Sequence, residues 1–162
     1  MFKNVFKNKV VLVTGHTGFK GSWLSIWLNL LGAKVIGVSL DPPTIPSHYD
    51  VIGLENFIDE KIIDIRRQDE IKKIIIESKP SFLFHLAAQS LVKRSYENPE
   101  ETYSTNIIGT LNVLEALREL KSKCTAIIIT SDKSYKNNEW VWGYKETDEV
   151  GGKDPYSASK GA

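Results

Sequence analysis

The best candidates for catalytic residues are a tyrosine and a lysine in the last segment of the sequence. Tyr156 and Lys160 stand four apart in PYSASKG, and on a helix this spacing brings two side chains to one face. A nearby ammonium group stabilises a phenolate and lowers the pKa of the phenol from its reference value of about 10. Tyr156 is therefore a candidate base that deprotonates an alcohol while a hydride leaves the same carbon.

Three consecutive polar residues form a second candidate for catalysis. Ser131, Asp132 and Lys133 lie in the segment TSDKSY. They follow an apolar run from Thr125 to Thr130 that is typical of a buried strand. In an α/β sheet, ligands bind beyond the carboxyl ends of the strands, so this segment is predicted to face the substrate. The alternatives to a catalytic role for Lys133 are a contact with a substrate phosphate and a simple surface charge.

The opening stretch from Lys9 to Gly32 predicts a site for an anionic cofactor. Its apolar run VVLV predicts a buried strand, and the apolar residues from Trp23 onward recur with helical periodicity. Between these elements stand Gly15, Gly18 and Gly21. Glycines allow a tight turn with positive φ and leave backbone N–H groups open to a pyrophosphate at the helix N-terminus. We therefore predict a dinucleotide site, the alternative being a turn with a purely structural role.

An acidic residue beyond the glycines bears on which dinucleotide is bound. Asp41 stands twenty residues after Gly21, at the end of the apolar run from Val35 to Leu40. A carboxylate there can accept hydrogen bonds from the hydroxyls of an adenosine ribose and would repel a 2′-phosphate. This favours NAD over NADP. Since three prolines follow within five residues, a turn-capping aspartate is the alternative.

These candidate groups need a parallel sheet to position them, and the rest of the sequence predicts one. Apolar strand patterns alternate with amphipathic helix patterns, which is typical of right-handed β-α-β units with helices on both faces of the sheet. We expect an α/β fold of the Rossmann type, a doubly wound parallel sheet. The further strands are predicted at Lys34–Leu40, Lys61–Ile65, Phe82–Leu86 and Thr125–Thr130, and the further helices at Gln68–Ser78 and Pro99–Leu120.

The organisation of the chain is predicted from its last residues and its length. The helix expected at PYSASKGA has barely two turns before Ala162, too few to be stable alone. We therefore expect residues 1–162 to be an incomplete NAD-binding Rossmann domain of a longer protein, truncated before a C-terminal substrate-binding part.

Composition excludes several classes of partner. Lys and Arg number 21 against 20 Asp and Glu, without a basic stripe, so nucleic acid is not an expected ligand. No apolar run approaches the roughly twenty residues of a membrane span, which favours a cytoplasmic protein without a membrane partner. Cys124 is the only cysteine and is expected to be buried. His85, alone inside an apolar strand, is expected to be a hydrogen-bonded core residue, so we predict no metal site.

Six segments together resemble a known family. They are VTGHTGFKGSWL, HLAAQ, ETYSTNIIGT, TSDKSY, EWVWGY and DPYSASKG, in that order. They are similar to the extended short-chain dehydrogenase/reductases, and within that family to the 4,6-dehydratases that act on CDP-glucose. The resemblance implies a lyase with tightly held NAD, a nucleotide-sugar substrate, and a homodimer formed through the Pro99–Leu120 helix and the final helix. It also implies a role in deoxysugar biosynthesis for lipopolysaccharide O-antigen.

The resemblance assigns roles to the five catalytic candidates. Tyr156 would take the proton of the sugar C4 hydroxyl while Ser131 hydrogen-bonds that oxygen, and Lys160 would bind the nicotinamide ribose. Lys133 would then remove the C5 proton and Asp132 would protonate the leaving C6 hydroxyl. The residues implied to bind the cofactor are Gly15, Thr17, Gly18, Phe19, Gly21, Asp41, Asp64, Ile65, Ala87, Ala88, Asn106, Tyr156 and Lys160.

Two other functions remain open from the sequence. A nucleotide-sugar epimerase of the same family also oxidises C4 but eliminates no water, and it needs no acid/base pair after the serine. A dinucleotide-binding module without catalysis is the second alternative, and we expect the 162-residue chain alone to be inactive. Related dTDP-glucose dehydratases have a glutamate where this sequence has Lys133. In a dehydratase the base at C5 would therefore be an amine here, and it would have to be neutral to accept a proton.

Overall fold

The computed structural model describes residues 2–162, which form two compact units. The first unit extends through Ala87 and takes up the chain again at Leu111–Ile129. The second unit comprises Ala88–Thr110 and Thr130–Ala162. The sheet belongs to the first unit, and the segments with the catalytic candidates belong to the second.

The first unit contains the predicted parallel sheet. Within the described residues five strands pair in the order β3-β2-β1-β4-β5, all parallel to one another. This confirms the expected Rossmann-type α/β fold. The strands are β1 (Val10–Thr14), β2 (Lys34–Ser39), β3 (Asp59–Ile62), β4 (Phe82–His85) and β5 (Thr125–Ile128).

Strand β3 differs from its prediction at Lys61–Ile65. The ladder with β2 runs from Asp59 to Ile62 and ends where β2 itself ends, at Ser39. Strand β3 is an edge strand with charged and largely exposed residues, so apolar patterning did not identify its first half. The apolar residues that suggested the later position belong to the following turn, where Ile65 is 3% exposed.

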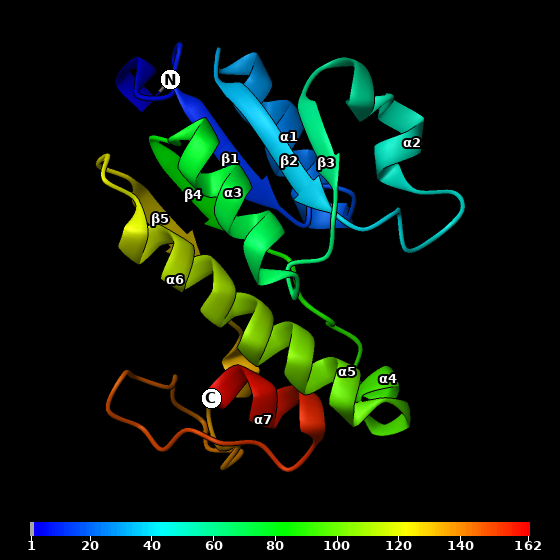
Figure 1. Cartoon of the computed structure of the whole chain (residues 1–162). Helices are drawn as coiled ribbons and strands as arrows, with labels where there is room; N and C mark the ends of the chain where they lie inside the picture. Colours follow the sequence, from blue (N-terminus) through cyan, green and yellow to red (C-terminus); the bar gives the residue numbers. More distant parts are fainter. Residues whose placement is uncertain (1) are drawn as a thin grey trace. The chain divides into compact units, whose positions relative to one another are not determined.

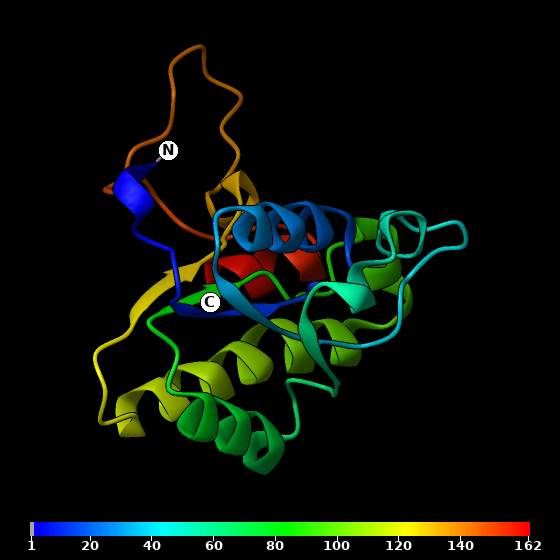
Figure 2. The same ribbon diagram turned by 90° about the horizontal axis from the view of Figure 1, so that it is seen from above.

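Helices cover both faces of the sheet. Successive side chains of the central strand point to opposite faces, so its apolar residues can pack against helices on both. On one face, Leu12 packs with residues of α3 (Gln68–Ser78) and α6 (Thr110–Glu119). On the other, Val11 and Val13 pack with residues of α1 (Phe19–Leu30). Figure 2 shows α1 on one side of the sheet and α3 with α6 on the other, as Figure 1 labels them.

Shorter elements complete the first unit. A 3-10 turn at Phe2–Asn4 precedes β1, and α2 (His48–Ile52) with a 3-10 turn at Leu54–Asn56 precedes β3. Helix α2 was not predicted, because the prolines before it break regular structure and its five residues are too few for a periodic signal. It begins at Ser47, whose Oγ accepts a hydrogen bond from the Asp50 backbone N–H at 3.0 Å.

The second unit consists of short helices and a long loop. It holds α4 (Val92–Glu97), α5 (Pro99–Tyr103), a 3-10 turn at Asp132–Ser134 and α7 (Pro155–Gly161). The predicted α-helix at Pro99–Leu120 is not uniformly α-helical, because Ser104–Gly109 forms a π-helical segment between α5 and α6. π-Helical turns are frequent at functional sites.

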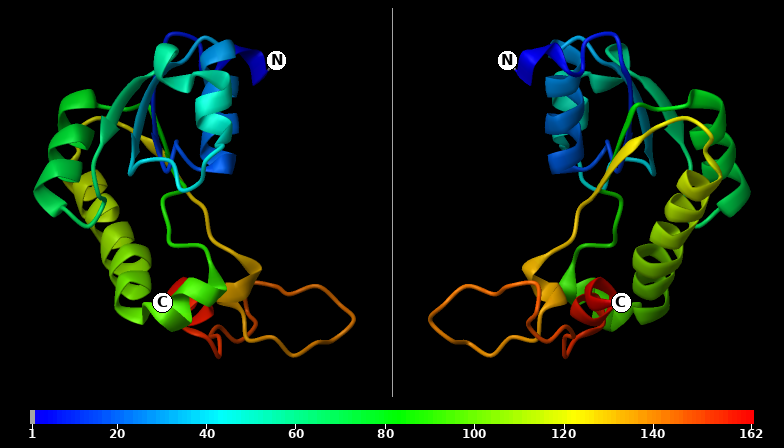
Figure 3. Two further views of the ribbon diagram at one scale, coloured as in Figure 1. Left: turned by 90° about the vertical axis from the view of Figure 1, so that its right-hand side faces the viewer. Right: turned by 90° about the vertical axis from the view of Figure 1, so that its left-hand side faces the viewer.

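The aromatic loop before α7 stacks on itself. Trp140 stacks on Trp142 with centroids 5.3 Å apart, and Tyr144 stacks on Tyr135 at the same distance. A bridge between Tyr135 and Val150 closes the base of the loop, which Figure 3 shows running out from α7 in orange. The loop thus forms its own small aromatic cluster in the second unit, and Trp142 stays 64% exposed.

Two expectations from composition concern membranes and cysteine. Among the residues from Phe2 onward, no helix combines the length and apolarity that a membrane crossing requires. Cys124 is partly buried and packs against the core between the sheet and helices α3 and α6. This partial burial raises the pKa of its thiol.

Candidate cofactor and catalytic sites

The predicted cofactor residues of the first unit gather at the carboxyl ends of four strands. Gly15 directly follows β1, Asp41 follows β2, Asp64 follows β3 and Ala87 follows β4. The strand order reverses between β1 and β4. In doubly wound sheets the crevice at this switch point is where a nucleotide binds, because the turns on its two sides diverge.

Close approach requires glycine at two of the three glycine positions of the turn, Gly15 and Gly21. Gly15 has a φ of +78°, and a Cβ there would lie 2.8 Å from the Ala87 backbone N. A Cβ on Gly21 would lie 1.9 Å from the Gly15 carbonyl O, so the helix can approach the turn only with glycine there. Gly18 is the N-cap of α1 and its own Cβ would lie 3.3 Å from the same oxygen. The turn is therefore tight, and its glycines leave backbone N–H groups open to a pyrophosphate.

A buried threonine joins this turn region to strand β4. Thr14 Oγ1 accepts hydrogen bonds from the Leu86 and Ala87 backbone N–H groups, each at 3.1 Å. The same oxygen lies 2.7 Å from His85 Nδ1. Since Oγ1 already accepts twice, its proton is free to point to Nδ1. His85 is 3% exposed, which confirms its expected role as a hydrogen-bonded core residue.

Thr17 and Phe19, both predicted to bind the cofactor, face different surroundings. The Thr17 hydroxyl is 2.7 Å from Ser39 Oγ and donates to the Leu40 carbonyl at 2.8 Å. Its side chain therefore connects the glycine turn to the end of β2. Phe19, the first residue of α1, is 72% exposed. Because the Thr17 hydroxyl is engaged, only the backbone groups of Thr17 remain to contact a phosphate. The roles of Thr17 and Phe19 in cofactor binding stay predictions.

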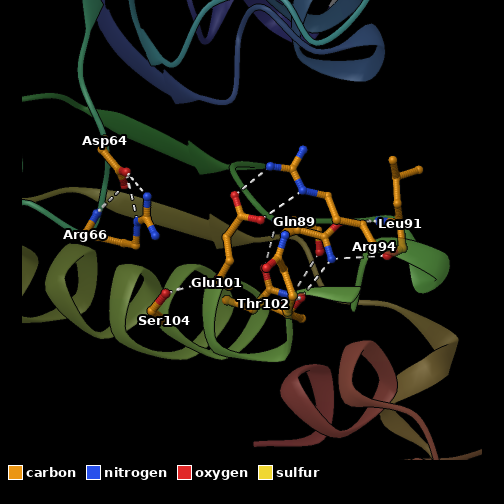
Figure 4. A network of polar contacts seen from close by, with 10 residues as sticks. Asp64, Arg66, Gln89, Leu91, Arg94, Glu101, Thr102 and Ser104 are labelled. Atoms are coloured by element: carbon orange, nitrogen blue, oxygen red, sulfur yellow. Dashed lines mark hydrogen bonds and ion pairs between the residues drawn. The ribbon is translucent and has the colours of Figure 1, made fainter. Parts of the chain in front are cut away.

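Asp41 and Asp64 lie in contrasting environments. Asp41 is exposed in the loop after β2, where it is accessible to a ribose. The Asp64 carboxylate accepts the Arg66 Nε at 2.8 Å and the Arg66 backbone N–H at 2.9 Å (Figure 4). The side-chain hydrogen bond from Arg66 lowers the pKa of Asp64, although partial burial opposes it. A cofactor that hydrogen-bonds to Asp64 would share this carboxylate with Arg66.

Ile65 is held by a residue that the sequence did not single out. Its carbonyl accepts the Asn112 side-chain Nδ2–H at 3.0 Å, and the Arg66 carbonyl accepts the same group at 3.1 Å. Asn112 is 5% exposed, although it lies in an amphipathic helix. A polar residue inside the apolar stripe of that helix is the signal that could have revealed it.

A second missed group lies next to the glycine turn. His16, fully buried, places Nε2 at 3.0 Å from Glu60 Oε2, and the Tyr49 hydroxyl donates to the same oxygen at 2.8 Å. Burial and the hydrogen bond to Glu60 raise the pKa of Tyr49. The three side chains connect the turn, α2 and β3. The unusual histidine among the glycines was the available signal in the sequence.

In the second unit, the serine, aspartate and lysine of TSDKSY form a compact turn. Ser131 is the N-cap of the 3-10 turn and its Oγ accepts the Lys133 backbone N–H at 3.2 Å. The same hydroxyl donates to the Asp132 carboxylate at 3.0 Å. Asp132 and Lys133 are both exposed. To bind a substrate oxygen, the Ser131 proton must turn away from Asp132.

Tyr156 and Lys160 lie on α7, as predicted. The helix begins at Asp154, whose carboxylate accepts the Ser157 backbone N–H at 2.9 Å and the Ser157 hydroxyl at 2.6 Å. Burial raises the pKa of Asp154, but these hydrogen bonds outweigh it and the pKa lies below its ordinary value. Burial lowers the pKa of the Lys160 ammonium. The polar N-cap thus fixes the start of the helix that carries both catalytic candidates.

Asn106 connects α7 to the segment after β4 within the second unit. Its Nδ2 donates to the Gln89 carbonyl at 3.0 Å and to Ser159 Oγ at 2.8 Å, and its Oδ1 accepts the Gln89 N–H at 2.9 Å. The Ser159 hydroxyl donates to the Tyr156 carbonyl at 2.7 Å. All polar atoms of the Asn106 amide therefore hold backbone or hydroxyl groups around α7, so a direct role in cofactor binding stays a prediction.

The Gln89 side chain extends this network, and the sequence did not single it out. Its Nε2 donates to Thr102 Oγ1 at 2.9 Å and to the Leu91 carbonyl, and its Oε1 accepts the Leu91 N–H at 2.7 Å. Figure 4 shows these contacts beside the Arg94–Glu101 ion pair. A buried, fully hydrogen-bonded amide of this kind fixes local geometry.

A hollow of about 520 Å³ opens beside the TSDKSY turn within the second unit. Its lining includes Asp132, Lys133, Tyr135, Tyr144 and Lys153. Opposite charges and two aromatic rings thus surround a space that could take a sugar-sized ligand. The hollow is thus lined by both Asp132 and Lys133, the predicted acid and base.

The donor groups fit NAD and not a metal. A glycine-rich turn at a helix N-terminus suits a pyrophosphate, and exposed Asp41 suits an unmodified ribose. Across residues 2–162, no three His, Cys, Asp or Glu side chains are grouped so that they could hold a metal ion. The residues that would hold the dinucleotide in the first unit are those at the carboxyl ends of β1 to β4.

A family model and a related sequence that match this chain both carry the name of a nucleotide-sugar 4,6-dehydratase. The family model described as GDP-mannose 4,6-dehydratase matches residues 12–162. The chain is similar to the CDP-glucose 4,6-dehydratase of Salmonella typhimurium, with 52% identity over 98% of this chain and 44% of that protein. The chain therefore spans less than half the length of this relative.

Two solved structures share the fold. An epimerase from Methanothermobacter thermautotrophicus has a TM-score of 0.82 at 27% identity, covering 97% of this chain and 46% of that one. The UDP-glucose 4-epimerase of Bifidobacterium longum, solved with NAD+ and UDP, has a TM-score of 0.78 at 26% identity. It covers 93% of this chain and 45% of that one.

Proposed function

Because the chain belongs to the GDP-mannose 4,6-dehydratase family, we propose that the whole protein dehydrates CDP-glucose to CDP-4-keto-6-deoxyglucose with bound NAD. The observation that carries this proposal is the 52% identity to the Salmonella enzyme along nearly all of the chain. The exposed Asp132–Lys133 pair beside a sugar-sized hollow supports an elimination. The substrate and the reaction are proposals for the protein as a whole.

The first half of the reaction is an oxidation at C4 of the glucose. Tyr156, as phenolate, takes the proton of the C4 hydroxyl, and the Ser131 hydroxyl donates a hydrogen bond to the same oxygen. Lys160 binds the nicotinamide ribose in this proposal, and burial lowers the pKa of its ammonium group. NAD, when bound, supplies the redox chemistry by accepting the C4 hydride and returning it to C6.

The second half is an elimination and a reduction. The C4 carbonyl makes the C5 proton acidic, so that Lys133 in its neutral form removes it. Asp132 in its acid form protonates the C6 hydroxyl, the C6–O bond breaks and water leaves, giving a C5–C6 double bond. The Lys133 ammonium returns a proton to C5 when the C5–C6 double bond is reduced. The net change is the loss of one water molecule, with the cofactor regenerated.

NAD as the cofactor is supported by the glycine turn and by Asp41. Gly15, Gly18 and Gly21 leave backbone N–H groups of the turn open to a pyrophosphate, and an exposed carboxylate after β2 disfavours a 2′-phosphate. The similar epimerase of Bifidobacterium longum was solved with NAD+. Titration with NAD and NADP separately tests this preference, and equal affinities would contradict it.

A homodimer through the helical run of α5 and α6 is part of the proposal. Ile108, Leu111 and Leu114 recur along this run and are 44–48% exposed. Spacings of three residues place such side chains on one face of a helix, where a second copy could cover them. A role in O-antigen deoxysugar synthesis is proposed from the family resemblance, and a cytoplasmic location is proposed from the sequence, which has no run long and apolar enough for a membrane span.

Incubation of the full-length protein with CDP-glucose and NAD tests the function. We expect the alkali-induced absorbance of a 4-keto-6-deoxy sugar, and a product mass lower than that of the substrate by one water. Lys133→Ala should abolish the absorbance while NAD remains bound, and Lys145→Ala, an exposed lysine of the same unit outside the hollow, is the matched control. Undiminished turnover by Lys133→Ala would refute the role of this residue.

The two alternative functions give distinguishable results in the same assay. A C4 epimerase would convert CDP-glucose to its C4 epimer without loss of mass and without the alkali absorbance. Its support is the fold similarity to two epimerases. A dinucleotide-binding module would bind NAD and leave CDP-glucose unchanged.

A further inference from the structure

The loop between β2 and α2 carries Asp41, the carboxylate on which the preference for NAD rests. Residues 41–46 include three prolines, whose fixed φ angles leave the backbone few conformations. Apart from Pro42 these residues are exposed, so packing against a core does not determine the course of the loop. Its position therefore depends on how its two ends are held. We name residues 40–47 the Asp41 loop.

Thr17 of the glycine turn holds the start of the Asp41 loop. Its Oγ1 donates a hydrogen bond to the Leu40 carbonyl at 2.8 Å. A hydroxyl has one proton, so in the 2.7 Å contact between Thr17 Oγ1 and Ser39 Oγ the serine is the donor. Thr17 is 3% exposed, and water therefore competes little with its hydroxyl for these two partners. A single side chain of the glycine turn thus ties down the end of β2 at two points.

The Leu40 carbonyl is the part of the loop that controls Asp41. The Leu40 carbonyl and the Asp41 N–H belong to one planar peptide unit. A hydrogen bond that fixes the direction of this carbonyl therefore also limits the directions in which the Asp41 side chain can point. The Leu40 side chain is 54% exposed and provides little packing that would oppose a rotation of this peptide. The Thr17 hydroxyl is thus the group that restrains it.

The far end of the Asp41 loop is held separately, through α2. His48 Nδ1 lies 2.7 Å from Oγ of Ser22 in α1. The Tyr49 hydroxyl donates to Glu60 Oε2 at 2.8 Å and so connects α2 to β3. These contacts do not involve Thr17. Loss of the Thr17 hydroxyl should therefore loosen the start of the loop and leave its far end in place.

We propose that Thr17 is a positioning residue for cofactor selectivity: its hydroxyl directs the Asp41 carboxylate toward the 2′-hydroxyl of the adenosine ribose. The inference rests on the proposed binding of NAD. A carboxylate held at this place accepts a hydrogen bond from the ribose, whereas a 2′-phosphate there would bring two negative charges together. Thr17 acts through Asp41, and its hydroxyl is already engaged within the protein.

Calorimetric titration of the full-length protein with NAD and with NADP tests the proposal. The measured quantity is the selectivity ratio, the Kd for NADP divided by the Kd for NAD. Thr17→Val removes the hydroxyl at nearly constant volume and should lower this ratio about tenfold, as expected for the loss of a hydrogen bond to a charged group. Thr17→Ser keeps the hydroxyl and is the matched control, with a native ratio. Thermal unfolding shows whether the variants are folded, and Thr17→Ala, which adds no atom, replaces Thr17→Val if it is not.

A second background separates positioning of Asp41 from a general effect on the fold. In an Asp41→Asn protein, Thr17→Val should change the ratio less than about threefold, because the carboxylate through which Thr17 acts is gone. A full change of about tenfold in that background, or an equal loss of affinity for both dinucleotides in Thr17→Val alone, overturns the inference.

Failure of the inference and failure of the proposed cofactor give different results. A native protein that prefers NAD, with the same preference in Thr17→Val, refutes the role of Thr17 and leaves NAD as the cofactor. A native protein that binds neither dinucleotide, or that prefers NADP, refutes the proposed cofactor and the inference together.

Discussion

Substitution of Gly21 by alanine gives the sharpest test of the cofactor turn. The new Cβ would lie 1.9 Å from the Gly15 carbonyl O, whereas an ordinary contact begins at 3.4 Å. The start of α1 would have to move about 1.5 Å from the turn, and neither neighbour is a flexible side chain. Overpacking of this kind costs about 2 kcal/mol. For a chain of this length, Tm should fall by about 4–8 °C.

The same displacement should weaken dinucleotide binding. The pyrophosphate is expected to contact backbone N–H groups at the turn, and their displacement with the helix should lower NAD affinity at least about tenfold. Calorimetric titration with NAD and thermal unfolding measure the two effects. Gly143→Ala is the matched control, because nothing lies within 4 Å of a Cβ there. A Gly21→Ala protein with native Tm and native affinity would refute the argument from close approach.

Three further predictions concern the helix of the catalytic candidates. Ser159→Ala removes the acceptor of the Asn106 Nδ2–H and should cost about 1–3 kcal/mol in the free energy of unfolding, measured in urea; an unchanged midpoint would contradict the network. Asp154→Ala should cost about 1 kcal/mol at pH 7. The pKa of Asp154 is lower in the folded protein than in the unfolded chain. Its carboxylate therefore contributes fully to the free energy of unfolding above the unfolded pKa of about 3.9, and this contribution is lost as the pH falls through the folded pKa. The stabilities of the variant and of the native protein should then converge in acid. The folded pKa of Lys160 is also lowered, so native stability should rise with pH between the folded value and the unfolded value of about 10.4, and Lys160→Met should remove that rise.

The sequence predicted the sheet and the glycine turn because both depend on local, repeated signals. Buried parallel strands are continuously apolar, and a glycine turn between strand and helix has a fixed spacing. The edge strand β3 was misplaced because its exposed residues lack that apolar signal. Helix α2 was missed because it is short and held by a cap and by tertiary contacts. The π-helical segment at Ser104–Gly109 has no periodic signature that distinguishes it from the α-helix around it.

For the candidate site, the sequence predicted that Tyr156 and Lys160 share a helix, but it did not reveal the supporting hydrogen bonds from distant residues. Tyr156 and Lys160 follow from helical spacing. The roles of Gln89, Asn112 and Glu60 depend on hydrogen bonds between residues far apart in the chain, and only the folded structure brings these partners together. A single sequence contains no information on such pairings beyond the presence of a polar residue in an apolar context.

The packing of His16 on strand β2 has an evolutionary consequence. A Cβ on Gly37 would lie 2.5 Å from the His16 ring, so the histidine excludes any larger residue at position 37. The two positions are therefore expected to covary among homologous sequences, with alanine or valine at position 37 only where position 16 is small. The order of substitution is also constrained, because the change at position 16 has to come first.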